Sequence, residues 1–286
     1  MNRPQLISPA GTLKSMRYAF AYGADAVYAG QPRYSLRVRK NEFATLESLA
    51  QGISEAHAQG KQFYLTANIL AHNAKVKTFL NDIAPLIELQ PDALIMADPG
   101  LIMQVRQRWP DLAIHLSVQA NTMNYASVQF WQAFGIQRLI LSRELSLADI
   151  AEIRQQCPQI ELEVFVHGAL CIAYSGRCLL SGYFNHRDAN QGSCTNACRW
   201  SYKLHGTYEQ DDTIFLLEEQ LRPQEYMPIF EDEHGSYIMN SKDLRAVQHI
   251  SALKAIGIDA FKIEGRTKSF YYVARTARTY RRAIDT

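Results

Sequence analysis

Hydrophobic residues along the chain fall into two alternating patterns. Short apolar runs rich in β-branched and aromatic residues predict strands, and longer stretches with an apolar residue every three or four positions predict amphipathic helices. The predicted strands are Leu6–Ser8, Ala26–Ala29, Phe63–Ala67, Ala93–Ala97, Ile114–Val118, Arg138–Leu141, Leu162–Val166 and Ala260–Ile263. The predicted helices are Thr12–Tyr22, Ala44–Ala58, Lys75–Leu89, Gly100–Arg108, Tyr125–Phe134, Leu147–Cys157, Asp243–Ile256 and Ser269–Ala283.

A weak internal repeat supports a barrel built from these units. Four segments read as a helix end, an apolar strand and then polar residues: GADAVYAG, QPDALIMADPG, GIQRLILSREL and GIDAFKIEGR. Eight strands alternating with helices predict a TIM-like (β/α)8 barrel, with a doubly wound open sheet as the alternative. We expect one domain over residues 1–286, with an insertion at 171–238 after the seventh strand.

The insertion is the least regular part of the pattern. We expect a polar loop at Asn185–Asn196, a charged turn at His205–Asp212 and a short antiparallel pair within Phe215–Asn240. Since the insertion follows a barrel strand, it should leave from the carboxyl-terminal face, where barrel enzymes place their active sites.

Composition narrows the class of protein. Of the 286 residues, 47% are apolar and 20% are charged, which is typical of a globular chain. A net charge of +2 does not by itself indicate a nucleic-acid-binding protein. The chain has no apolar run long enough to span a membrane, and its first residues lack a signal-peptide core. We therefore expect a cytoplasmic protein without a membrane partner.

Four of the five cysteines cluster within the insertion. Cys171, Cys178, Cys194 and Cys198 form the pattern C-x6-C-x15-C-x3-C, with glycines between them. In a reducing compartment, clustered thiols favour a metal site over disulfides. The first pair is too open for a zinc knuckle, so an iron–sulfur cluster is favoured, with zinc or reactive thiols as alternatives. Cys157 is expected to be an ordinary, partly buried cysteine.

Polar residues follow the predicted strands, where the side chains should converge on one cavity. They are Asn68, Asp98, Gln119, Asn121, Arg143, Glu144, His167, Lys262, Glu264 and Arg266. Arg143 and Arg266 suit a carboxylate-bearing ligand, because a guanidinium binds a carboxylate through two hydrogen bonds. Each residue also has a structural alternative: Asp98 can cap a helix, Glu264 can pair with Arg266, and His167 can either move protons or bond the backbone.

A basic loop after the second strand could contact a phosphate backbone. Its residues are Arg33, Tyr34, Arg37, Arg39 and Lys40. Tyr34 could stack on a base, and Arg199 with Lys203 could extend the basic rim. The alternative is a solvated charged loop. The arginines of the last helix are expected to be solvated or to form a docking surface.

The segment from Glu163 to Ser181, with Gly168, Cys171 and Cys178, resembles the signature of the collagenase-like peptidase family U32. Other segments that look like landmarks of this family are SPAG, GADAVYAG, HLSVQAN, MNSKDL and KIEGR, so the resemblance covers essentially the whole chain. YSLRVR and NQGSCTNACRW are most similar to the branch that hydroxylates the wobble uridine of tRNA to 5-hydroxyuridine. This branch works without oxygen and depends on prephenate.

The resemblance implies a 4Fe–4S cluster on Cys171, Cys178 and Cys194, with Cys198 as the candidate fourth ligand. It also implies prephenate as co-substrate and tRNA as partner. The residues we expect to carry the chemistry are His167, Glu264, Arg143, Arg266, Asn68, Asp98, Gln119 and Lys262. Members of this branch continue into a further C-terminal domain, which we expect this chain to lack.

Two other functions remain open at this stage. One is a peptidase, although the sequence has no convincing Ser/His/Asp set and no HExxH motif. The other is a non-catalytic RNA-binding protein with a structural metal. The sequence does not fix the oligomeric state.

Overall fold

A computed structural model describes most of the chain. The described residues are 3–30, 33–36, 41–171, 173–174, 177–186, 194–195, 197–200, 202–209, 212–220, 223–229, 231–232, 235–236 and 243–286.

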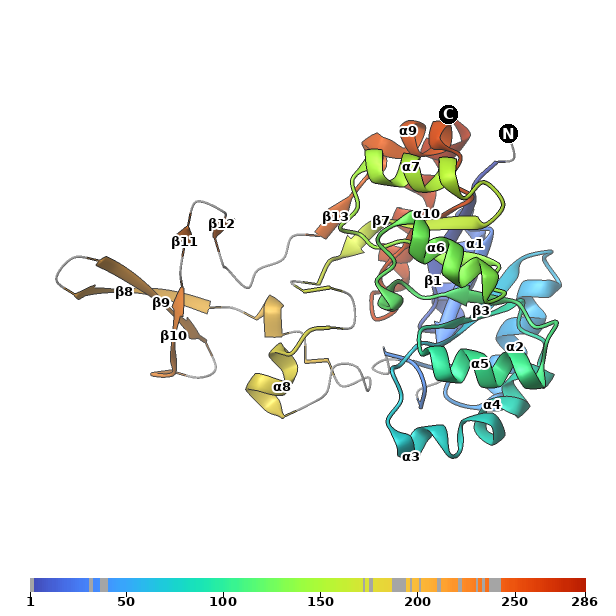
Figure 1. The fold of residues 1–286 in the computed structure, drawn as a ribbon, viewed down its shortest axis with the longest axis horizontal. Helices are drawn as coiled ribbons and strands as arrows, with labels where there is room; N and C mark the ends of the chain where they lie inside the picture. Colours follow the sequence, from blue (N-terminus) through green and yellow to red (C-terminus); the bar gives the residue numbers. More distant parts are fainter. Residues whose placement is uncertain are drawn as a thin grey trace.

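In this part of the chain, eight parallel strands close into a barrel with helices around it (Figure 1). They are β1 (Gln5–Pro9), β2 (Ala26–Gly30), β3 (Gln62–Ala67), β4 (Ala93–Met96), β5 (Ile114–Leu116), β6 (Arg138–Ile140), β7 (Glu161–Ala169) and β14 (Ala260–Ile263). Closure is made by β14, which pairs with β1 on one side and β7 on the other. The predicted (β/α)8 barrel is therefore confirmed, and the open sheet is excluded.

Side chains alternate strictly along the strands between the barrel interior and the helices, and so form the two layers of the core. Tyr28, Tyr64 and Ile95 point into the barrel and form one cluster with inward residues of the other strands. Their neighbours, such as Val27 and Leu94, point outward and are buried beneath the helices. Since both faces of a parallel barrel strand are covered, its sequence reads as a continuous apolar run.

The outer layer is formed mainly by helices, several of which begin directly after a capping side chain. They are α1 (Leu13–Ala21), α2 (Leu46–His57), α3 (Asn73–Val76), α4 (Phe79–Glu88), α5 (Pro99–Arg108), α6 (Tyr125–Ala133), α7 (Leu147–Gln156), α9 (Ile250–Ile256) and α10 (Phe270–Asp285). Thr12, Asn124 and Ser146 accept hydrogen bonds from backbone amides in the first turns of α1, α6 and α7. The structure describes no helix that is long and apolar enough to cross a membrane.

Two predicted helices differ from the observed ones. The predicted Lys75–Leu89 helix is two helices, α3 and α4, separated at Lys77 and Thr78. The predicted Asp243–Ile256 helix begins later, because Asp243–Arg245 forms strand β13, which pairs antiparallel with the end of β7. A 3-10 turn at Val247–His249 then leads into α9.

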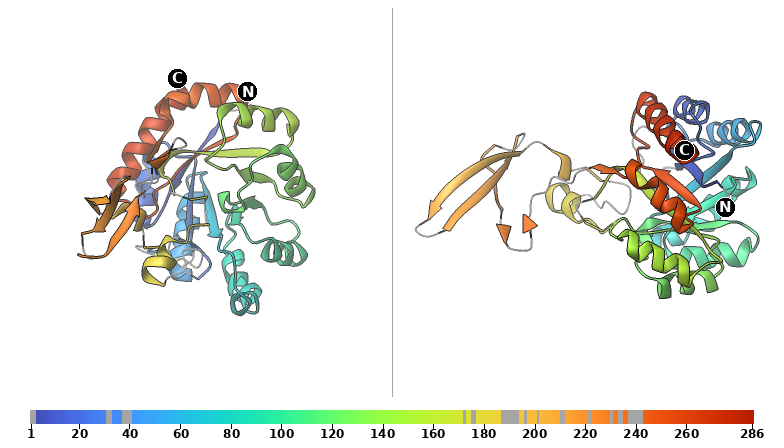
Figure 2. Two further views of the ribbon diagram at one scale, coloured as in Figure 1. Left: turned by 60° about the vertical axis from the view of Figure 1, so that its left-hand side comes forward. Right: turned by 90° about the horizontal axis from the view of Figure 1, so that it is seen from above.

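The insertion leaves the barrel after β7 and extends away from it (Figure 2). It contains α8 (Leu180–Asn185), a 3-10 turn at Ala197–Arg199, and strands β8 (Tyr202–Glu209), β9 (Asp212–Glu219), β10 (Tyr226–Ile229), β11 (Glu231–Asp232) and β12 (Gly235–Ser236). The predicted turn at His205–Asp212 is wrong, because β8 and β9 run through most of it as a hairpin. Most of the predicted loop Asn185–Asn196 lies outside the described residues.

Charged side chains are buried inside the barrel as well as apolar ones. Lys262 Nζ lies 2.7 Å from Glu163 Oε1, and Glu163 is fully buried. Arg138 bonds Glu161 Oε2 at 2.7 Å and lies 3.7 Å from Glu163 Oε2. A buried carboxylate needs such partners, since leaving it alone in a low-dielectric interior is very costly.

The buried His115 should make the fold sensitive to mild acid. Burial, together with the charges of Arg138 and Lys262, holds the pKa of His115 well below its ordinary value. Below about pH 6.5 the unfolded chain binds a proton here that the folded chain does not, so stability is present above this pH and falls below it. The loss is at most about 1.4 kcal/mol per pH unit. We expect His115→Gln to flatten the dependence of the urea-unfolding midpoint between about pH 6.5 and 5. An unchanged dependence would contradict this assignment.

Candidate functional site

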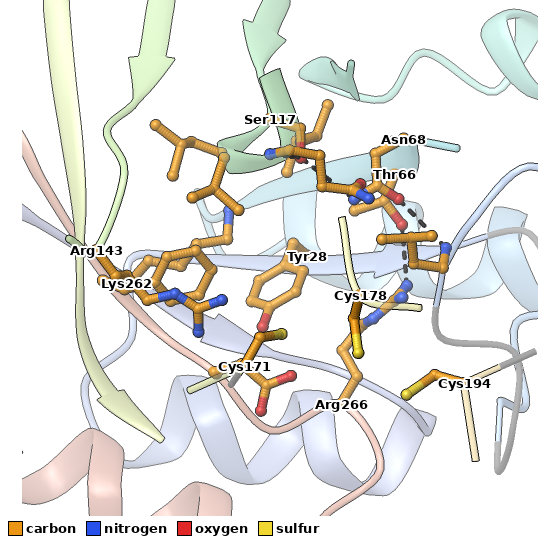
Figure 3. Close-up of a pocket in the computed structure, with 17 residues that line it drawn as sticks. Tyr28, Thr66, Asn68, Ser117, Arg143, Cys171, Cys178, Cys194, Lys262 and Arg266 are labelled. Atoms are coloured by element: carbon orange, nitrogen blue, oxygen red, sulfur yellow. Dashed lines mark hydrogen bonds between the residues drawn. The ribbon is translucent and has the colours of Figure 1, made fainter. Parts of the chain in front are cut away.

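A cavity of about 110 Å³ opens at the carboxyl-terminal end of the barrel (Figure 3). Its floor and walls come from seven of the eight barrel strands or the loops after them, and its remaining wall comes from the insertion. The lining residues are Tyr28, Leu36, Thr66, Asn68, Ile95, Ser117, Val118, Gln119, Ile140, Arg143, Phe165, Cys171, Cys178, Cys194, Lys262, Glu264 and Arg266. The cavity thus joins the cysteine segment to the barrel.

Three cations line the cavity, and each is held by neighbours. Lys262 is paired with Glu163, and its Nζ lies 4.4 Å from the centre of the Tyr28 ring. Arg266 donates to Thr66 Oγ1 at 2.9 Å, and Arg143 donates to the Ala169 carbonyl at 2.7 Å. Burial is the main factor that lowers the pKa of Lys262, and Glu163 opposes it. Fixed cations of this kind are suited to an anionic ligand.

Gly30, at the end of β2, is the residue that lets Arg266 reach its position. A Cβ atom placed on Gly30 would lie 2.2 Å from Arg266 Nη1 and 2.3 Å from both Ser35 Oγ and Thr66 Oγ1. These three side chains therefore pack directly against the backbone, where only glycine fits.

The cysteines form one side of the cavity. Cys171, Cys178 and Cys194 line it, whereas Cys198 is half-buried outside the lining. Burial raises the pKa of the Cys178 thiol, and the neighbouring Cys171 and Cys194 raise it further. The three sulfurs are thus near enough to interact, and three thiols are the donor type that an iron–sulfur cluster uses.

The described side chains include no group of three His, Cys, Asp or Glu already arranged to hold a metal ion.

The opposite wall is polar and carries two amide side chains. Asn68 accepts from the Leu36 amide and donates to Ser117 Oγ, both at 3.3 Å. Gln119 lies in the 3-10 turn Val118–Ala120 after β5 and is only 2% exposed. The cavity wall therefore combines cations, thiols and amides.

Of the ten polar residues predicted to converge, six line the cavity and four do not. The six are Asn68, Gln119, Arg143, Lys262, Glu264 and Arg266. Asp98 caps α5 by accepting from Gly100 and Leu101, which is its structural alternative. Glu144 is exposed, and Asn121 has a left-handed backbone and donates to the Gln119 carbonyl.

His167 is kept out of the cavity by an irregularity in β7. Lys262 pairs with Phe165, but the next residue, Ile263, pairs with His167, so the register skips one residue. This bulge turns His167 toward α10, where its Nδ1 lies 3.2 Å from Tyr280 Oη. Burial lowers the pKa of His167, partly opposed by Asp243.

The described part of the basic loop differs from the predicted RNA contact. Tyr34 is 1% exposed, bonds Asp82 and packs edge-on against Phe79, so its ring is not available to a base. Arg33 pairs with Asp82 at 3.2 Å and remains half-exposed. Arg37, Arg39 and Lys40 lie outside the described residues.

Two inward residues of the site were not singled out from the sequence. Tyr28 provides the aromatic floor beside Lys262, and Glu163 holds the lysine. The sequence signal that could have found Glu163 is the two-residue period of a strand. Glu163 lies two positions before the inward Phe165, so it should point inward too. Cys157, by contrast, is buried and donates to the Tyr125 carbonyl, as expected of an ordinary cysteine.

Fold and cavity define a TIM-barrel protein with cysteines lining the cavity at the carboxyl-terminal end of its barrel. The model of peptidase family U32 matches residues 11–286, and the chain belongs to this family.

Two relatives in this family carry the names of RNA-modifying proteins. The chain is 61% identical over 311 aligned positions to tRNA hydroxylation protein P of Escherichia coli, covering 100% of this chain and 68% of that protein. It is 32% identical to the 23S rRNA 5-hydroxycytidine C2501 synthase of E. coli, covering 99% of this chain and 40% of that protein. The chain thus spans about two thirds of the first relative's length.

Solved structures support the fold alone. A U32 peptidase structure matches with a TM-score of 0.56 at 12% identity, covering 93% of this chain and 94% of that one. Phosphoribosyl anthranilate isomerase, another solved structure, matches with a TM-score of 0.51 at 10% identity, covering 99% and 98%.

The packing around Gly30 generates a direct test of the site. Gly30→Ala should displace Arg266 from Thr66 and lower the free energy of unfolding by about 1–3 kcal/mol, as overpacking does. Urea unfolding of the purified variant measures this loss. A loss below about 0.5 kcal/mol would show that the neighbouring side chains can move aside.

Proposed function

We propose that the protein hydroxylates a uridine of tRNA to 5-hydroxyuridine, with prephenate as the source of the hydroxyl group and an iron–sulfur cluster at the cysteines. The observation that carries this proposal is one cavity that combines three thiols with three fixed cations. The name of the relative at 61% identity supports the reaction and the tRNA substrate. A tRNA substrate would place the protein in the cytoplasm.

The three cations would bind the co-substrate. Prephenate carries two carboxylates, and Arg266 and Arg143 can each bind one through their guanidinium groups. Lys262, at the base of the cavity, adds a third positive charge. Since Glu163 and Thr66 already orient Lys262 and Arg266, little side-chain entropy is lost on binding.

Cys171, Cys178 and Cys194 would hold the cluster, with Cys198 as the proposed fourth ligand. Replacing C5–H of uracil by C5–OH removes two electrons from the base. Prephenate would accept these two electrons and the proton released from C5, because its ring C–OH becomes C–H when the hydroxyl is transferred, so atoms and electrons balance. A bound cluster would supply electron-transfer chemistry.

Glu264 is the residue we propose for proton transfer at the uracil ring. It lines the cavity next to the cations, whereas His167 lies against α10 on the far side of the bulge. A carboxylate inside the cavity can accept the proton released from C5.

The peptidase alternative finds little support at this site. No histidine lines the cavity in the described chain, so a thiol nucleophile there lacks the usual base.

Cysteine substitution combined with metal analysis tests the proposal. We expect anaerobically purified protein to contain iron and acid-labile sulfide and to form 5-hydroxyuridine on tRNA with prephenate, detected by mass spectrometry of digested nucleosides. Cys171→Ala and Cys178→Ala should lose the iron and at least about 100-fold of the activity, because each removes a metal ligand.

Cys157→Ala is the matched control, since this buried cysteine lies outside the cavity. It should keep both iron and activity. Stoichiometric zinc in place of iron, or full activity of the cavity variants, would refute the proposal.

A further inference from the structure

We propose that Gln119 recognises the target base by hydrogen bonding to the N3–H and O4 edge of uracil. The inference rests on the proposed function and goes further by naming the residue that reads the base. The observations that lead to it are the burial of Gln119, its unsatisfied amide group and its place in the cavity wall.

The backbone around Gln119 fixes where its side chain points. Ser117 caps the 3-10 turn and accepts from the Gln119 amide, and Asn121 closes the turn with φ of 50° and ψ of 51°. The Asn121 side chain donates to the Gln119 carbonyl at 2.9 Å. Both backbone polar groups of Gln119 are therefore bonded, and its side chain lines the cavity.

The amide group of this side chain has no partner among the described residues. Gln119 is 2% exposed, and both Nε2 and Oε1 are buried without a hydrogen bond. Leaving a buried donor or acceptor unsatisfied costs the full desolvation penalty of that group. Such a cost is typical of a site that waits for a ligand.

Asn68 provides the comparison on the same wall. Its oxygen accepts from the Leu36 amide and its nitrogen donates to Ser117 Oγ, so its amide is used to hold the wall together. Of the two amides, Gln119 is the one whose donor and acceptor face the ligand.

The hydrogen-bonding groups of the two substrates indicate which one binds the Gln119 amide. Prephenate presents its carboxylates as acceptors, and its one donor, the ring hydroxyl, lies on the far side of the ring from the ring carboxylate, so it does not offer a donor and an acceptor side by side. The uracil edge presents N3–H as a donor and O4 as an acceptor side by side, which satisfies both atoms of the amide. The cations already provide for the carboxylates, so we assign Gln119 to the base.

The cavity also contains two aromatic residues, as expected of a site that binds a nucleobase. Tyr28 and Phe165 both line it, and each ring already lies near a cation of the cavity, Lys262 Nζ at 4.4 Å from the Tyr28 centre and Arg143 Cζ at 4.9 Å from the Phe165 centre. Enzymes that act on a nucleobase turn it out of its stack and hold it by stacking and by hydrogen bonds to its pairing edge.

The test compares two substrates with several variants. The substrates are tRNA with uridine and tRNA with 3-methyluridine at the target position, in which the methyl group removes the N3–H donor. Wild type should hydroxylate the uridine tRNA with a kcat/KM at least about 100-fold higher than for 3-methyluridine. Gln119→Met keeps the shape of the side chain and should lower kcat/KM for uridine tRNA by about 100-fold. It should leave the KM for prephenate unchanged.

Gln119→Ala makes room for the methyl group, so its preference for uridine over 3-methyluridine should fall below about tenfold. Gln119→Glu keeps the acceptor and loses the donor, so its kcat/KM for uridine tRNA should lie between those of wild type and Gln119→Met. It replaces Gln119→Met in the test if that variant does not fold. Gln51→Met, an exposed glutamine on α2, is the matched control and should behave as wild type.

The outcomes separate the two claims. If wild type hydroxylates uridine tRNA and the Gln119 variants keep both its rate and its preference, the role of Gln119 is overturned and the proposed function stands. If Gln119→Met raises only the KM for prephenate, Gln119 binds the co-substrate and the inference is again overturned. An inactive wild type overturns the proposed function and the inference with it.

Discussion

The buried ion pair between Lys262 and Glu163 connects the two strands on which the site depends. Glu163 lies on β7, which leads into the cysteine segment, and Lys262 lies on β14, which leads into Glu264 and Arg266. Removing one partner of such a pair costs about 3–5 kcal/mol, because the other charge is left buried and unpaired. The pair therefore links β7 to β14 where the barrel closes and keeps a cation at the base of the cavity.

Local periodicity was enough to predict the barrel. Each strand occupies its predicted place because both of its faces are covered, and helix starts follow residues such as Thr12 and Ser146 whose side chains cap the first turn. The insertion was harder to predict. Its charged hairpin is stabilised by pairing between β8 and β9, which single residues do not reveal.

The composition of the site was predictable only in part. Residues after strands converge when the strands are regular, which holds for Asn68, Gln119 and Arg266. His167 fails this rule because a bulge one residue earlier reverses its direction. The predicted stacking of Tyr34 on a base fails because Tyr34 is held by Asp82, a partner that is distant in sequence. Neither the bulge nor the long-range hydrogen bond can be read from the local pattern.

Transfer of oxygen from prephenate to uridine is the central claim of this account. It is tested most directly by supplying prephenate labelled with ¹⁸O at its ring hydroxyl to anaerobically purified protein and tRNA under an oxygen-free atmosphere. Mass spectrometry of the nucleosides should then show 5-hydroxyuridine that carries the heavy isotope. Product with unlabelled oxygen, or no product from iron-loaded protein, would contradict the account.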